Sequence, residues 1–296
     1  MTSIDLFTRA RTPATLAACI ALLAACSRHA PAAAPHPATP AASAAGAAAG
    51  AALPSPRPLD KKQGEAVMRT LFGAAYDAAQ HSAQATITVD GAEHDVVMSL
   101  VAAATLPDGR VGAVVNGMPD GASQPDAGIL NVYVLRHSGN AWTVAARHEG
   151  VDELGTNGQL GSARWVMLGA GKPGFIVSSG GLWQGYSISS ADIYELGSQV
   201  RGMGGFQEGS SNSGACTPAL DACWDVDGDI RVAAEAQPGG YHDLLVDFKG
   251  KRYTVSEGRD GKEVEHLKST VRQTARYRFD GKSYVLKAGT NPVPAV

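Results

Sequence analysis

Short turn signals that separate apolar runs constrain the fold of this chain more than any other feature of its sequence. Asp90-Gly91, Ser138-Gly139-Asn140 and Asp280-Gly281-Lys282 each stand between two runs of β-branched, aromatic and aliphatic residues. Such turns join neighbouring antiparallel strands, because Gly, Asn and Asp readily adopt the backbone conformations that tight hairpins need. With 35 glycines and 16 prolines among 296 residues, further turns are expected. The sequence therefore predicts a mainly β fold of the α+β type, an antiparallel, hairpin-rich sheet body with one N-terminal helix.

A further hairpin is predicted at Lys249-Gly250-Lys251, between strands at 244–248 and 252–255. In three of the predicted turns an aromatic residue stands three positions after the glycine, where its ring can pack across the hairpin on a neighbouring strand. The glycines and aromatic residues are Gly139 and Trp142, Gly250 and Tyr253, and Gly281 and Tyr284.

The N-terminal helix is predicted from a capping pattern followed by a helical stripe. Asp60 stands three residues before Gln63, which is the spacing of a capping box. Apolar residues then recur at helical spacing and continue through Ala-rich turns to about His81. The stripe contains Val67, Met68, Leu71, Phe72, Ala75 and Ala78. We expect this face to pack on a sheet, and docking of a partner protein is the alternative.

The first residues have the parts of an export signal. Arg9 and Arg11 give a basic region, and 15–25 form an apolar segment that is too short to span a bilayer. The residues Leu23-Ala24-Ala25-Cys26 match a lipobox, so that residues 1–27 resemble the leader of a bacterial lipoprotein. The resemblance implies a signal peptide at 1–25, lipidation of Cys26 and, because Ser27 follows, an anchor in the outer membrane of the cell envelope with the body facing the periplasm. An ordinary secretory peptide or a short membrane anchor is the alternative.

Beyond the leader, composition separates a tether from a folded body. Residues 26–59 are dominated by Ala, Pro, Ser and Gly, which supply too little apolar bulk for a core, and we expect them to be disordered. A β-rich periplasmic domain is expected over 60–290, with a division into two sub-layers near 197–215 and a long Gly- and Ser-rich surface loop at 202–214. Residues 1–25 hold two basic side chains and one acidic one, which leaves 25 − 2 = 23 basic and 28 − 1 = 27 acidic side chains, a formal charge of −4. This balance argues against a nucleic-acid partner.

Two features in the last third carry site hypotheses. Cys216 and Cys223 are an isolated pair in a chain with an export signal, which predicts a disulfide. Metal ligation or redox chemistry is the alternative, although a C-x₆-C pair has neither the C-x-x-C spacing of the redox motif nor a second Cys/His pair nearby for a metal.

Asp225, Asp227 and Asp229 alternate in one short segment, and such carboxylates suit a hard cation such as Ca²⁺. The spacing fails the EF-hand pattern, and a polar turn is the alternative. No cofactor is otherwise predicted.

The Gly-rich stretch at 178–186 carries the candidate contact residues Trp183, Gln184 and Tyr186. Large aromatic side chains with polar tips are favoured as anchors for protein partners and for sugars. The alternative is that both aromatic side chains complete the core. Residues three apart in one strand face opposite sides, so we expect at most one of the two to point inward.

Catalytic motifs are absent from the sequence: it contains neither G-x-S-x-G nor H-E-x-x-H, and its histidines are dispersed. The predicted function is a lipid-anchored cell-envelope protein with a non-enzymatic binding or structural role in the periplasm. Its partners would be the membrane, through the N-terminal lipid, and either another envelope protein or a cell-wall glycan. An envelope hydrolase with a scattered active site is the alternative.

Overall fold

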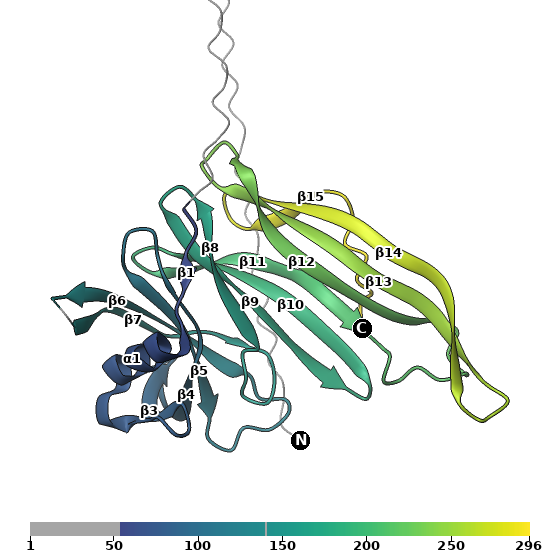
Figure 1. Cartoon of the computed structure of the whole chain (residues 1–296), viewed down its shortest axis with the longest axis horizontal. Coiled ribbons are helices and arrows are strands. Elements are labelled where there is room, and N and C mark those ends of the chain that lie inside the picture. The colour runs from purple at the N-terminus through teal and green to yellow at the C-terminus, as the bar shows by residue number, and fades with distance from the viewer. Residues whose placement is uncertain (1–53, 140) are drawn as a thin grey trace, which may run out of the picture. The chain divides into compact units, whose positions relative to one another are not determined.

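The computed structural model describes residues 54–139 and 141–296. These residues form two antiparallel sheets and a single α-helix, which confirms the predicted mainly β fold (Figure 1). The predicted signal peptide, the lipobox with Cys26 and most of the predicted tether lie outside the described residues. Within the described ranges, no helix has the length and apolar character needed to cross a membrane.

The chain forms its two sheets one after the other. The first contains β1 (Arg57–Pro58), β2 (Tyr76–Asp77), β3 (Ser82–Val89), β4 (Ala92–Thr105), β5 (Val111–Pro119), β6 (Gly128–Ser138) and β7 (Ala141–Leu154). The second contains β8 (Ser162–Gly169), β9 (Lys172–Trp183), β10 (Tyr186–Leu196), β11 (Val200–Ser211), β12 (Cys223–Ala236), β13 (His242–Glu257), β14 (Glu263–Phe279) and β15 (Tyr284–Ala288). Apart from β1, which pairs with β4, the strands in each sheet follow their order in the chain.

Helix α1 (Lys61–Phe72) begins as predicted but ends earlier. The Asp60 carboxylate accepts a hydrogen bond from the Gln63 backbone (2.8 Å), and the Gln63 side chain accepts one from the Asp60 backbone (3.0 Å), so the capping box is confirmed. The predicted continuation to His81 is wrong. Gly73 ends the helix with a positive φ of 57°, and a single 3-10 turn at Gly73–Ala75 follows before Tyr76 enters β2.

Three predicted hairpins are confirmed, and one is wrong. The pairs Val89–Ala92, Ser138–Ala141 and Phe279–Tyr284 close the turns at the predicted positions. In contrast, β13 runs without interruption through Gly250, which lies opposite Val226 on β12 and Val271 on β14. A Cβ on Gly250 would overlap the carbonyl oxygen of Asp225, so this glycine permits a close approach of two strands instead of a turn.

The predicted surface loop at 202–214 is also wrong over most of its length, because β11 extends to Ser211. Two of its glycines, Gly205 and Gly209, lie where neighbouring strands come close. A Cβ on Gly205 would overlap the carboxylate of Asp192 on β10, and one on Gly209 would crowd Ser189 and Asp227. A low intrinsic strand propensity is therefore overcome by pairing along β10.

The first sheet is buried on both faces. On one face, Val67, Met68 and Leu71 of α1 pack with alternate residues of β3–β6, such as Tyr133. The opposite face presents Val114, Leu130, Val132 and Val134, which pack with aromatic and aliphatic side chains of β8–β10, such as Phe175. This double burial explains the nearly continuous apolar runs in β5 and β6.

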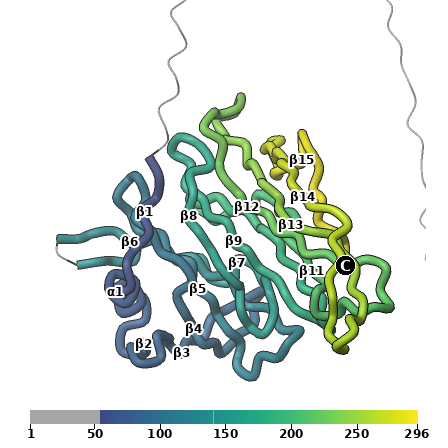
Figure 2. The backbone as a smooth tube through the Cα atoms, turned by 45° about the vertical axis from the view of Figure 1, so that its right-hand side comes forward, coloured from purple at the N-terminus to yellow at the C-terminus, as the bar shows by residue number. Residues whose placement is uncertain are grey.

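The second sheet folds back on itself. Strands β11 and β12 are paired only at Ser210–Val226 and Ser211–Asp225. In a flat sheet β8 and β12 would lie about 19 Å apart, because strands are spaced at about 4.8 Å; instead they touch, and Arg164 of β8 donates a hydrogen bond to the Ile230 carbonyl of β12. The strands β8–β11 and β12–β15 therefore enclose a common core between them (Figure 2).

The boundaries of the body differ from the sequence prediction at both ends and inside it. Arg57 and Pro58, assigned to the tether, pair with Thr105 and Ala104 of β4. At the other end, the Pro294 carbonyl accepts hydrogen bonds from β11, so the packed chain extends past residue 290. The chain passes from the first sheet to the second at 155–161, where the sequence predicted no division. The division predicted near 197–215 overlaps β11, and the second sheet folds back at the end of that strand.

Candidate functional site

Trp183, Gln184 and Tyr186 lie at the tip of the β9–β10 hairpin. Gln184 and Gly185 form its two-residue turn with φ values of 48° and 85°, as expected for a type I′ turn. Trp183 and Tyr186 are paired across the turn on different strands, so the argument that placed them at opposite sides of one strand is wrong. Trp183 is 44% exposed and the neighbouring Leu182 is 62% exposed, whereas Tyr186 is half-buried. The exposure of Trp183 excludes the alternative in which both aromatic residues belong to the core.

The hairpin tip, defined as Leu182–Tyr186, is braced by three other segments. The Gln124 side chain donates a hydrogen bond to the Leu182 carbonyl (2.6 Å), and the Gly214 N–H donates one to the Gly185 carbonyl (3.1 Å). The Tyr186 ring lies 6.1 Å from that of Trp224, which belongs to β12. The tip is therefore held in one conformation although its apolar side chains face solvent.

The predicted disulfide is confirmed. Cys216 and Cys223 are bonded, with their Cα atoms 5.7 Å apart, and they pack with Tyr253 and Val255 of β13. The Asn212 side chain, just ahead of this loop, accepts a hydrogen bond from the Trp224 N–H and so fixes the start of β12. Since Trp224 also contacts Tyr186, the disulfide loop and the hairpin tip, which were predicted separately, are neighbours in the structure.

Asp225, Asp227 and Asp229 do not form a cation loop or a polar turn. All three are exposed on β12 and point to one side, alternating with buried residues. Their partners across the ladder are Lys251, Lys249 and Asp247. The Cα atoms of alternate residues in a strand are roughly 7 Å apart, so these carboxylates stand in an open row and do not surround a common point as in a cation-binding loop. Among residues 54–139 and 141–296, no group of three or more His, Cys, Asp or Glu side chains could hold a metal ion.

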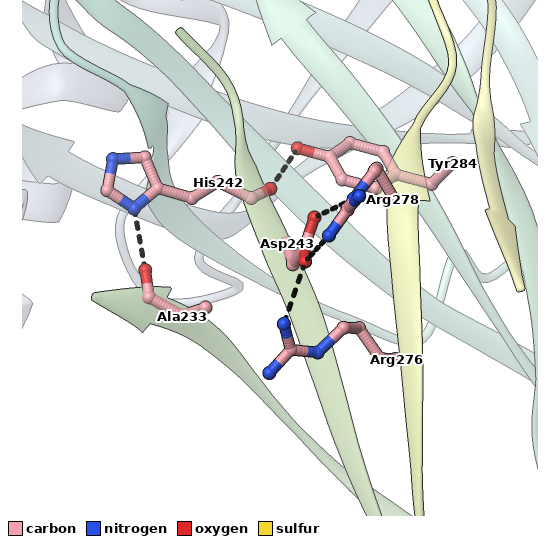
Figure 3. A network of polar contacts seen from close by, with 6 residues as sticks. All are labelled: Ala233, His242, Asp243, Arg276, Arg278 and Tyr284. Atoms are coloured by element: carbon pink, nitrogen blue, oxygen red, sulfur yellow. Dashed lines mark hydrogen bonds and ion pairs between the residues drawn. The ribbon is translucent and has the colours of Figure 1, made fainter. Parts of the chain in front are cut away.

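An ionic network that the sequence did not predict centres on the buried carboxylate of Asp243 on β13, which is paired with two partly exposed arginines (Figure 3). Arg278 donates two hydrogen bonds to the Asp243 carboxylate, both at 3.1 Å, and Arg276 donates one at 3.3 Å. The neighbouring His242 points to the other side of the strand, with Nδ1 2.6 Å from the Ala233 carbonyl. Since His242 and Asp243 diverge, they do not form a catalytic dyad, and the network serves to join β13 to β12 and β14. In the sequence, the two arginines at alternate positions, Arg276 and Arg278, were the feature from which a partner carboxylate on a neighbouring strand could have been predicted.

No protein-family model, curated protein or solved structure matches this chain. The argument about function therefore depends on the geometry of the chain itself.

A second feature missed by the sequence analysis is a cavity of about 420 Å³ between the start of α1, strand β4 and strand β8. This volume lies within the range of about 300–1,000 Å³ that is usual for ligand pockets. Burial, together with the Glu65 carboxylate, raises the pKa of Tyr76, and burial lowers the pKa of Arg164. At neutral pH the phenol stays protonated and the guanidinium stays charged, so neither shift supplies the general base that a hydrolase would need.

Proposed function

We propose that this chain is a lipid-anchored protein of the bacterial cell envelope with a non-enzymatic binding role in the periplasm, and that the hairpin tip contacts another envelope protein. The observation that carries the proposal is the exposure of Leu182 and Trp183 on a tip that hydrogen bonds hold in place. A rigid aromatic anchor loses little conformational entropy on binding, and Trp is among the residues most enriched at the energetic centres of interfaces. The adjacent Leu182 enlarges the apolar surface, which favours a protein partner over a glycan.

Anchoring is supported by the lipobox, and we expect Cys26→Ser to abolish membrane attachment. Without the thiol no acyl chain can be attached, so the variant should accumulate as an unprocessed or mislocalised precursor. Fractionation of cells followed by mass spectrometry of the N-terminus measures the outcome. Cys19→Ser is the matched control and should behave as the wild type, because Cys19 lies in the part that is cleaved off. Acylation and normal membrane attachment of the Cys26→Ser variant would refute the anchor.

For the hairpin tip, we expect Trp183→Ala to leave stability almost unchanged while it weakens partner binding. Surface substitutions usually alter the free energy of unfolding by less than about 0.5 kcal/mol, whereas loss of a Trp anchor weakens binding by about 2 kcal/mol or more, roughly thirtyfold. A denaturant melt measures the first quantity. The second is followed in cells by a photo-crosslinker at position 184, with and without Trp183→Ala.

Leu267→Ala is the control for this experiment, because Leu267 is 61% exposed on β14, outside the tip. A discrete, protease-sensitive adduct that disappears with Trp183→Ala but persists with Leu267→Ala supports the proposal. A muramidase-sensitive adduct would identify a glycan as the partner instead of a protein. A loss of 3 kcal/mol or more in the melt would assign Trp183 to the core, since Trp→Ala in a core costs about 3–5 kcal/mol. The hydrolase alternative stays a prediction.

A further inference from the structure

The cavity beside β4 lies over a gap in strand pairing. Strand β3 pairs with β4 only as far as Ser99, and β1 begins its pairing at Ala104. Among the described residues, the four positions 100–103 have no strand beside them on this edge, and only the Ala103 carbonyl is used, by the N–H of Leu59. All residues from Leu100 to Ala104 line the cavity. Leu100 and Ala103 pack on the α1 side of the sheet, whereas Val101, Ala102 and Ala104 pack on the opposite side, so a cavity that touches them all lies at the strand's edge.

The opposite wall of the cavity is a second strand edge. Strand β8 is the terminal strand of its sheet, and Ala163, Arg164 and Trp165 line the same cavity. A smaller cavity of about 310 Å³ continues past Trp165 along Val166 and Met167. The first cavity is therefore a slot between the edges of β4 and β8, while the second lies between β8 and residues 232–234 of β12. An apolar ligand in the slot would leave backbone groups of both edges without hydrogen-bond partners.

Charged groups of opposite sign stand at the two ends of the gap. Lys61 lies two residues after Leu59, whose N–H bonds the Ala103 carbonyl, so this lysine belongs to the β1 end. The Asp60 carboxylate also lines this end, where it accepts the Gln63 N–H as the helix cap. The Arg164 guanidinium is directed to the Ile230 carbonyl of β12 instead. One helical turn beyond Lys61, Glu65 has its carboxylate 3.9 Å from Nδ1 of His81, the residue that precedes Ser82 and its partner Ser99. The β3 end therefore carries the Glu65 carboxylate, and the β1 end carries the Lys61 ammonium group beside the Asp60 carboxylate, which is already used as the helix cap.

We propose that this slot binds a short peptide with free termini in an extended conformation. The peptide backbone pairs with residues 100–103 of β4, its α-ammonium group lies at Glu65, and its carboxylate lies at Lys61. A peptide bound in this direction runs parallel to β4, with its ammonium group at the β3 end of the gap and its carboxylate at the β1 end. The wall residues Ala102, Ala103 and Ala163 favour small side chains on the ligand. Addition of an extended segment to an open sheet edge is a common mode of peptide recognition.

The test uses the full-length protein and trialanine, titrated by calorimetry. We expect saturable binding that weakens about tenfold with Glu65→Gln and about tenfold with Lys61→Gln, because each removes one charge-assisted hydrogen bond. Lys62→Gln is the matched control: Lys62 is exposed on the same helical turn, does not line the cavity, and its loss should leave binding unchanged. Thermal melts of all variants verify that the fold is intact.

Two modified peptides complete the test without altering the protein. Trialanine that is acetylated and amidated at its ends lacks both charges and should bind more weakly than trialanine to the wild type. Trialanine with an N-methyl group on its central amide lacks one backbone donor and should also bind more weakly. Absence of saturable binding at millimolar trialanine, or equal affinity of the three peptides, would overturn the proposal.

Discussion

Replacing Phe175 by alanine is expected to lower the free energy of unfolding by about 3–5 kcal/mol. Phe175 has no exposed surface and lies in the one cluster to which both sheets contribute. Its ring stacks on Tyr194 with 5.0 Å between centroids and lies 5.1 Å from that of Trp165. Truncation would open a cavity between two sheets, each of which is also held by packing on its other face, so the surroundings cannot collapse into the void.

A denaturant melt of Phe175→Ala measures this loss. Phe175→Leu is the matched control, and we expect it to cost less than the alanine variant, because most of the apolar volume is retained. If both variants melted like the wild type, the packing of the first sheet on β8–β10 would be wrong.

Gly250→Val is expected to lower the free energy of unfolding by about 3 kcal/mol. Strand propensity alone predicts that the same substitution raises the free energy of unfolding, since exchanging Gly for a β-branched residue within a strand favours the strand by up to about 1 kcal/mol. The difference arises from the neighbouring strand, because a Cβ at this position overlaps the backbone carbonyl of Asp225 and also approaches the Cα of Val226. Backbone atoms in a paired strand cannot move aside without breaking the ladder between β12 and β13.

Gly202→Val provides the control for that prediction. Gly202 lies within β11 opposite Tyr194, and a Cβ there would meet no atom within 4 Å. Its replacement should leave stability unchanged or raise it by up to about 1 kcal/mol. Equal melting of the two valine variants would show that the close approach at Gly250 is not required.

The contrast between Asp90-Gly91 and Lys249-Gly250-Lys251 shows which parts of the fold are encoded locally. The first turn needs positive φ values, 50° and 83°, and its residue types supply them without help from the rest of the chain. The glycine of the second is needed because β12 and β14 lie on either side of it. No local pattern distinguishes these two uses of glycine, and for that reason the sequence analysis assigned a turn to Gly250 and a loop to β11.

The candidate sites differ in the same way. The hairpin tip could be predicted more accurately, because Gln184-Gly185 between two aromatic residues is itself a two-residue turn signal. The disulfide followed from the number of cysteines. The slot beside β4 could not be predicted, since it exists only because β3 begins at Ser82, opposite Ser99, while the distant segment Arg57–Pro58 takes up the same edge further along. Likewise, the burial of Asp243 depends on which residues of β14 lie opposite β13.

The order of the strands has a consequence for how quickly the chain folds. From β2 to β7 and from β8 to β15, each strand pairs with the one that follows it, mostly across a short turn. Contacts between residues close in sequence cost little loop-closure entropy, and proteins dominated by them fold faster than β proteins whose strands pair across long connections. A nascent chain of this kind can add one strand at a time to an existing hairpin. The packing of β8 on β12 and of the second sheet on the first must wait for distant residues.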